Sequence, residues 1–169
     1  QNSCNVFFSE MGHRLSMDEN GNYSPELGIE KIRKYASMFG LDETSGIEIA
    51  EREPQMTTEK PEASSIGQGK NSYSNIQLSR YITAVANKGT VFKLSLLDKM
   101  TDSQGNLLKD FTPEVRSTID VKDSTWNAVH TGMRRVISDG SARKIFSDLE
   151  VDIAGKTGTA EEIKNGHRV

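Results

Sequence analysis

The feature of this sequence that most constrains its fold is a series of helical segments with marked ends, separated by short strand-like runs. Residues 3–15 carry apolar side chains every three to four positions, which predicts an amphipathic helix. Ser24-Pro25 predicts an N-cap followed by proline at the first helical position, and Gly40 predicts a left-handed stop after that helix. These signals predict a chain that begins with two helices.

Further helices are expected along the rest of the chain. Asn75 is expected to cap a helix that ends at Lys88-Gly89, Asp123 one that ends at Asp139-Gly140, and a short helix should run through Ile145-Phe146. Trp126 lies on the apolar face of the second of these helices, so we expect it in the core rather than in a ligand site.

Strand-like runs are interspersed among the helices. We expect them at residues 47–49, within 90–115 on either side of a polar turn at 102–106, and at 151–158. Residues 165–169 are typical of a turn followed by the start of a strand. Because helices outnumber strands and the two are mixed, the sequence favours an α/β or α+β fold.

Composition excludes several classes of protein. The net charge is -3, which does not suggest a nucleic-acid-binding protein. No apolar run approaches the roughly 18 residues that a membrane span needs. The single Cys4 excludes an internal disulfide, and the 3 histidines are too far apart to resemble a zinc site. We therefore expect neither a metal nor a cofactor.

The strongest chemical signal is Lys156-Thr157-Gly158-Thr159. A strand with this sequence can supply an ammonium group, a hydroxyl donor for a carboxylate, and backbone groups that pair with an extended substrate. Glycines on both sides of Lys-Thr allow the substrate to approach the backbone. The three-residue match alone is weak, and an ordinary strand end is the structural alternative.

Ser3-Cys4-Asn5, at the start of the first expected helix, is the second signal. A serine at a helix start is most often a cap. In the functional alternative, the Ser3 hydroxyl takes part in a proton relay and the Asn5 amide binds the substrate backbone. Cys4 is interpreted as a small packed residue and not as a nucleophile.

Several segments, in order, resemble the class B penicillin-binding proteins, which are monofunctional peptidoglycan transpeptidases. The segments are Ser3–Phe8, Ser65–Gly69, Gln77–Thr90, Gly140–Lys144 and Val151–Glu161. The resemblance covers nearly the whole chain. It implies a β-lactamase/transpeptidase-like fold with a helical subdomain and part of an antiparallel sheet. Residues 1–169 would then be a partial transpeptidase domain, truncated at both ends.

The sequence departs from the family pattern in two places. The nucleophile motif Ser-x-x-Lys should precede Ser3, where only Gln1 and Asn2 stand, so the chain alone is expected to be inactive. Ser141-Ala-Arg-Lys144 fits these letters but lies in the wrong order, and we interpret Ser141 as a helix-start serine. The further strands and the C-terminal helix of the family are also expected beyond residue 169, which would leave the Lys156 strand short of partners.

The resemblance also implies roles for the site residues. Ser3, Asn5 and Lys156 would be catalytic: Ser3 would relay protons, Asn5 would hold the acyl chain, and Lys156 would keep the site positive. Thr157, Gly158 and Thr159 would bind substrate, with the Thr159 N–H as one oxyanion donor. Gln68 is a candidate for direct substrate contact, while Gly67 and Gly69 serve backbone geometry.

The implied substrates are peptidoglycan stem peptides that end in D-Ala-D-Ala, and β-lactam antibiotics would acylate the same serine. Other cell-wall synthesis proteins are implied partners, and the parent protein would lie on the outer face of the bacterial cytoplasmic membrane, anchored by an upstream helix. Three alternatives stay open: a D,D-carboxypeptidase or β-lactamase of the same fold, a non-catalytic β-lactam sensor, and an inert structural fragment.

Overall fold

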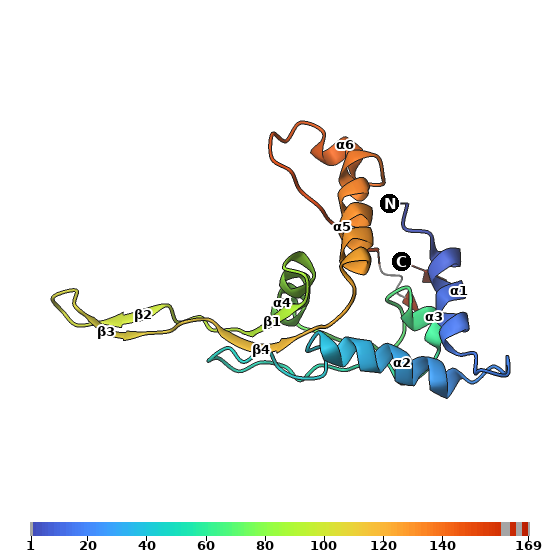
Figure 1. Ribbon diagram of the computed structural model, residues 1–169, viewed down its shortest axis with the longest axis horizontal. Helices are drawn as coiled ribbons and strands as arrows, with labels where there is room; N and C mark the ends of the chain where they lie inside the picture. The colour runs from blue at the N-terminus through green and yellow to red at the C-terminus, as the bar shows by residue number, and fades with distance from the viewer. Residues whose placement is uncertain (1, 160–162, 165–166, 169) are drawn as a thin grey trace. The chain divides into compact units, whose positions relative to one another are not determined.

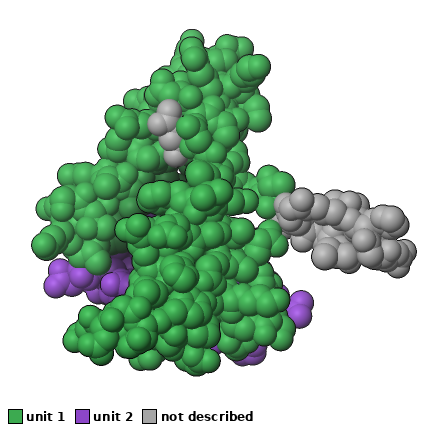
Figure 2. Space-filling model, turned by 90° about the vertical axis from the view of Figure 1, so that its right-hand side faces the viewer, with its two compact units in different colours: residues 1–32, 57–70, 121–169 green, residues 33–56, 71–120 purple. Residues whose placement is uncertain are grey.

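The chain folds into two compact units. The computed structural model describes residues 2–159, 163–164 and 167–168. Unit 1 comprises residues 1–32, 57–70 and 121–169, and unit 2 comprises residues 33–56 and 71–120 (Figure 2). The helices are α1 (Asn5–Leu15), α2 (Pro25–Met38), α3 (Pro61–Ser64), α4 (Asn75–Ala86), α5 (Asp123–Ser138) and α6 (Arg143–Phe146). The strands are β1 (Thr90–Lys93), β2 (Lys99–Thr101), β3 (Leu107–Asp110), β4 (Glu114–Thr118), β5 (Ile163–Lys164) and β6 (His167–Arg168) (Figure 1).

In unit 1, α1 packs closely against α3 through a buried glycine. A Cβ on Gly12 would lie 2.5 Å from the carbonyl oxygen of Pro61 and 2.6 Å from the Ser65 hydroxyl, so only glycine fits without a shift. Beside this contact, Glu62 accepts a hydrogen bond from the Tyr23 hydroxyl at 2.9 Å. That hydrogen bond, with burial and the carboxylate charge, raises the pKa of Tyr23. The close contact at Gly12 thereby fixes the C-terminal half of α1 against α3.

The second half of unit 1 is built on α5. Trp126 is 5% exposed, which confirms its predicted place in the core. Val136 and Ile137, near the C-terminal end of α5, form an apolar cluster with Ala142, and Ile153 packs against it. This cluster attaches the segment that precedes Lys156 to α5, and burial of these apolar side chains stabilises that attachment.

In unit 2, α4 packs on β1, which pairs with β4 in antiparallel register from Thr90↔Thr118 to Lys93↔Glu114. Ala84 on α4 and Val91 on β1 are both 0% exposed and form the centre of this contact. The β2–β3 hairpin continues from the end of the β1–β4 pair (Figure 1). Mixed helices and antiparallel strands thus confirm the predicted α+β class.

Buried Arg80, on α4, organises the loop that follows α2. Its guanidinium donates to the carbonyl oxygens of Thr44 at 3.0 Å and Glu43 at 3.2 Å, and also to that of Gly40. Gly40 has a φ of 74°, which confirms the predicted left-handed stop. These contacts replace regular backbone pairing in the loop.

The turn at 102–106 is held by one carboxylate. The Asp102 side chain accepts from the backbone N–H groups of Gln104 and Asn106, each at 2.8 Å, and from the Asn106 amide. These hydrogen bonds, the Asn106 side chain first among them, lower the pKa of Asp102. This geometry confirms the predicted turn between strands.

Two predicted helix caps were displaced by one residue. Ser74, not Asn75, is the N-cap of α4, where it forms a capping box with Gln77. Lys122, not Asp123, is the N-cap of α5, and Asp123 is its first helical residue. Ser74 is of a preferred N-cap type like its neighbour Asn75, whereas the Lys122 side chain makes no capping hydrogen bond to any described residue.

Two predicted strands are wrong. Residues 47–49 and 151–158, all of them described, form no strand. Glu48 instead accepts hydrogen bonds from the Ser95 hydroxyl and, at 2.9 Å, from the Leu96 N–H, so side-chain bonds replace a backbone ladder. The strand predicted within residues 165–169 is confirmed by β6, which pairs with β5. Residues 165, 166 and 169 lie outside the described part of the chain.

The structure also overturns the interpretation of Cys4 as a packed residue, because its side chain is exposed. Within the described residues, no helix is long and apolar enough to cross a membrane.

Candidate active site

The segment that precedes Lys156 lies along the C-terminal half of α5. The Gly155 N–H donates to the Met133 carbonyl at 3.2 Å, and the Arg134 guanidinium donates to the Ile153 carbonyl at 3.1 Å. A Cβ on Gly155 would lie 3.7 Å from the Ile137 side chain, which shows how closely this backbone approaches the helix. This extended segment pairs with no strand among the described residues, and α5 holds it in place instead.

Lys156 projects from this segment toward the beginning of the chain. Its ammonium donates to the Ser3 hydroxyl oxygen at 2.7 Å and to the Thr157 carbonyl at 2.6 Å. Two residues separated by 153 positions thus share a hydrogen bond within unit 1. An ammonium has three N–H donors. The described residues accept two of those of Lys156, so the third can bind a ligand.

Ser3 does not cap α1. The N-cap is Cys4, whose side chain makes no capping hydrogen bond to any described residue. Ser3 itself has a φ of 50°, a left-handed conformation that is uncommon for serine and often marks functional sites. The structural alternative, in which Ser3 serves as a helix cap, is therefore wrong, and the Ser3 hydroxyl is directed to Lys156 instead.

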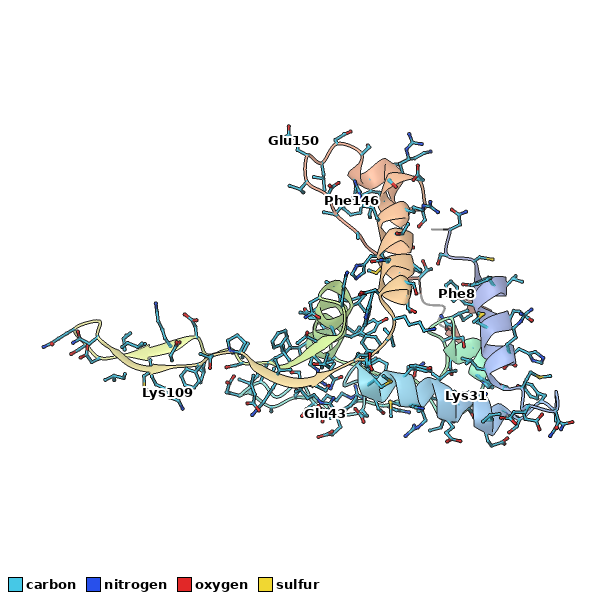
Figure 3. All side chains as sticks on the ribbon, in the orientation of Figure 1. Phe8, Lys31, Glu43, Lys109, Phe146 and Glu150 are labelled. Atoms are coloured by element: carbon cyan, nitrogen blue, oxygen red, sulfur yellow. The ribbon has the colours of Figure 1, made fainter. Side chains whose placement is uncertain are left out.

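Asn5 is the first residue of α1, and its side chain is exposed. The same helix carries Phe8, which is 44% exposed (Figure 3). Asn5 lies two residues after Ser3, at the N-terminal end of α1.

Thr157 has a neighbour that the sequence did not predict. Its hydroxyl lies 3.3 Å from the Ser141 hydroxyl, and either oxygen can be the donor. The interpretation of Ser141 as a helix-start serine is wrong, because α6 begins at Arg143 with Ala142 as its N-cap. No motif in the sequence predicts a contact between residues 141 and 157. The contact arises because the segments that carry them both pack against α5.

The other predicted substrate-binding residues, Gly158, Thr159 and Gln68, lie outside helices and strands. Gly158 and Thr159 are exposed and follow Thr157 directly. Gln68 is half-buried on the loop after α3, where its N–H donates to the Ala63 carbonyl at 2.9 Å. The flanking Gly67 and Gly69 have φ values of 80° and 96°, as expected for residues that serve backbone geometry.

Two contacts bring hydroxyls to the segment 156–157: the Lys156 ammonium donates to the Ser3 hydroxyl, and the Thr157 hydroxyl pairs with that of Ser141. The Lys156 ammonium and the Thr157 hydroxyl are groups that can bind a carboxylate through hydrogen bonds. The close ammonium also favours negative charge on the Ser3 oxygen, which helps that hydroxyl to release a proton. The described residues therefore support anion binding and proton transfer.

Comparison with known proteins identifies a family whose model matches nearly the whole chain. The model of the family "Penicillin binding protein transpeptidase domain" matches residues 1–168. The chain is 32% identical over 147 residues to Penicillin-binding protein H of Bacillus subtilis, which covers 80% of this chain and 20% of that protein. It is 27% identical over 168 residues to the peptidoglycan D,D-transpeptidase MrdA of Escherichia coli, which covers 85% of this chain and 26% of that protein.

The fold also has solved relatives. Penicillin-binding protein 2B of Streptococcus pneumoniae superposes with a TM-score of 0.81 at 23% identity, over 98% of this chain and 30% of that one. The likeness confirms the predicted β-lactamase/transpeptidase-like fold. The 169 residues span about a quarter of the length of the curated relatives they match.

Proposed function

This chain belongs to the penicillin-binding protein transpeptidase domain family, and from that premise we propose that it is part of a serine-type peptidoglycan D,D-transpeptidase. The observation that carries the proposal is the 2.7 Å hydrogen bond from the Lys156 ammonium to the Ser3 hydroxyl. The Ser-x-Asn and Lys-Thr-Gly motifs of the family require this convergence, because neither can act on one substrate without the other.

The nucleophile is a serine of a Ser-x-x-Lys segment outside these 169 residues. Its oxygen attacks the carbonyl carbon of the penultimate D-Ala of a stem peptide, and its proton is transferred to the lysine of that motif. The peptide C–N bond then breaks, the terminal D-Ala leaves with a proton on its amine, and an acyl-enzyme remains. The amine of a second stem peptide attacks the ester and restores the serine hydroxyl as the cross-link forms.

Ser3 passes the proton to the leaving amine. With its oxygen held by Lys156, the Ser3 hydroxyl keeps its hydrogen available for donation toward the reacting atoms. Lys156 stabilises the negative charge that develops on Ser3 as the proton is transferred. Its remaining N–H and its positive charge also attract the C-terminal carboxylate of the stem peptide.

The other motif residues bind the substrate. Asn5 holds the acyl chain through its exposed side-chain amide, and Thr157 and Thr159 bind the terminal carboxylate. Gly158 keeps the backbone accessible, and the Thr159 N–H is one oxyanion donor. Gln68 contributes a direct contact to the stem peptide from its loop.

We further propose that the parent protein lies on the outer face of the cytoplasmic membrane, where its substrates are found. β-Lactams imitate D-Ala-D-Ala and acylate the same serine. Other proteins of cell-wall synthesis are its partners, and the reaction needs no cofactor.

Acylation by a labelled penicillin tests this function. We expect covalent labelling of a longer protein that carries the upstream Ser-x-x-Lys, and none of the 169-residue chain. Lys156→Gln in the longer protein should lower the second-order acylation rate about 100-fold or more, because it removes a positioned positive charge. The control, Lys144→Gln, changes another exposed lysine of unit 1 and should leave the rate unchanged.

The same experiment separates the alternatives. Slow deacylation favours a transpeptidase, whereas rapid turnover of the penicillin identifies a β-lactamase. Labelling without cross-linking or release of D-Ala identifies a sensor. Labelling of the 169-residue chain at Ser3 or Ser141 would refute the motif assignment.

A further inference from the structure

We propose that Ser141 is a positioning residue that orients the Thr157 hydroxyl toward the carboxylate of the substrate, an inference that rests on the proposed function. The observation is the hydrogen bond between the Ser141 and Thr157 hydroxyl oxygens, which are 3.3 Å apart. Ser141 does not touch the substrate in this scheme. It acts through Thr157.

The two hydroxyls meet because both of their segments are anchored to the same helix. On one side, the Ala142 N–H donates to the Val136 carbonyl at 3.1 Å, and the Ala142 side chain is 2% exposed in the cluster with Ile137. Ser141 directly precedes this anchor. Its backbone is therefore fixed between the C-terminal end of α5 and the start of α6.

On the other side, Thr157 follows an anchor of its own. The Gly155 N–H donates to the Met133 carbonyl at 3.2 Å, one turn before Val136 on α5. Ile153 packs against the cluster that holds Ala142. A single rigid helix thus sets the distance between residues 141 and 157, which is what a positioning contact requires.

The direction of the hydrogen bond follows from the number of protons. A threonine hydroxyl has one proton and two acceptor sites. When Thr157 donates its proton to a carboxylate, its oxygen can only accept from Ser141, so Ser141 becomes the donor. The result is a chain of hydrogen bonds from Ser141 through Thr157 to the carboxylate, in which each bond polarises and strengthens the next.

This role differs from the two that the sequence suggested for Ser141. It is not a helix cap, because the N-cap of α6 is Ala142. Its hydroxyl is paired with Thr157 rather than with the lysine of Ser141-Ala-Arg-Lys144, so the structure also does not support a nucleophile. The contact with Thr157 is the one on which the new role depends.

Kinetics of acylation in the longer protein test the role of Ser141. For a penicillin with a free carboxylate, Ser141→Ala should raise the dissociation constant of the non-covalent complex about 3- to 10-fold, the effect of one hydrogen bond. The rate of acylation within that complex should change less than about twofold, because the reacting atoms are untouched. Ser141→Thr keeps the hydroxyl and should restore binding.

A matched control uses another serine of the same unit. Ser147 is exposed and donates to its neighbour Asp148 at 3.0 Å, away from Thr157, so Ser147→Ala should leave both constants unchanged. The methyl ester of the penicillin, which lacks the carboxylate, should bind wild type and Ser141→Ala equally. In a double-mutant cycle, Ser141→Ala should have no further effect once Thr157→Val is present.

The outcomes are distinguishable. If wild type is not acylated at all, the proposed function fails. If wild type is acylated but Ser141→Ala binds the penicillin normally, or weakens the ester as much as the acid, the positioning role is wrong. Additive effects of Ser141→Ala and Thr157→Val would overturn it as well.

Discussion

Gly12→Ala should destabilise unit 1, because it adds a methyl group where α1 meets α3. The new Cβ would lie 2.5 Å from the Pro61 carbonyl oxygen, 2.6 Å from the Ser65 hydroxyl and 2.9 Å from the Glu62 Cα. Optimal contacts between heavy atoms are about 3.5–4.0 Å, so α1 must move away by roughly 1 Å. The Ser65 side chain can rotate, but the backbone atoms of α3 cannot yield without moving the helix.

The expected magnitude combines two opposing effects. Overpacking of this kind costs about 1–3 kcal/mol of folding free energy. Replacement of a helical glycine by alanine returns about 0.5–1 kcal/mol, because alanine loses less backbone entropy. The middle of each range gives a net loss of about 1 kcal/mol.

Gly132→Ala is the matched control. Gly132 is also inside a helix of unit 1, but a Cβ there would meet no atom within 4 Å. The substitution should therefore stabilise the protein by about 0.5–1 kcal/mol. Urea denaturation followed by fluorescence of the single Trp126, which is buried in the same unit, measures both variants with one probe.

The two glycine variants should have opposite signs. If Gly12→Ala were as stable as wild type, the close approach of α1 and α3 would not limit the packing, and the reasoning would be refuted. A displaced α1 should also weaken the Ser3–Lys156 contact, so Gly12→Ala should slow penicillin acylation of the longer protein while Gly132→Ala does not.

Two further predictions concern unit 2. Arg80→Met should cost about 2–4 kcal/mol in urea denaturation followed by circular dichroism, because several loop carbonyls lose a donor in a buried site. Its control, Arg116→Met, changes a half-buried ion pair near the surface and should cost about 1 kcal/mol or less; equal losses would contradict the role given to Arg80. Asp102 has a folded pKa below its ordinary value of 3.8, so its contribution to stability is present above that pH and is lost as the pH falls through the folded pKa. Asp102→Asn should therefore lose less stability than wild type between about pH 5 and pH 3 in thermal denaturation, and an identical pH profile for the two proteins would contradict this origin.

Local sequence signals predicted most turns and the helices except the short α3, which begins at Pro61. The left-handed stop at Gly40, the polar turn at Asp102 and the break at Asp139-Gly140 each depend on a few neighbouring residues, and the structure has all of them. Burial of Trp126 followed from its place on an apolar helix face. The caps at Asn75 and Asp123 were misplaced by one residue: Ser74, also of a preferred cap type, forms the capping box of α4, and Lys122 precedes α5.

The failures share a different cause. The alternation at residues 151–158 is typical of a strand, but a strand needs a partner for its backbone groups, and the partner of this segment is α5. Residues 47–49 likewise bond through the Glu48 side chain. An alternating sequence pattern indicates that a segment favours a strand, but it does not indicate which element packs beside that segment.

For the site, the sequence alone determined the chemistry available: an ammonium, hydroxyls and an amide in two short motifs whose order identifies the family. It did not determine the left-handed Ser3, the 2.7 Å bond to Lys156, or the meeting of Ser141 with Thr157. Those contacts join residues far apart in the chain, and their geometry is set by the anchors on α5 and the packing within unit 1. Side-chain chemistry is a property of each residue, whereas a distance between remote residues exists only once the chain has folded.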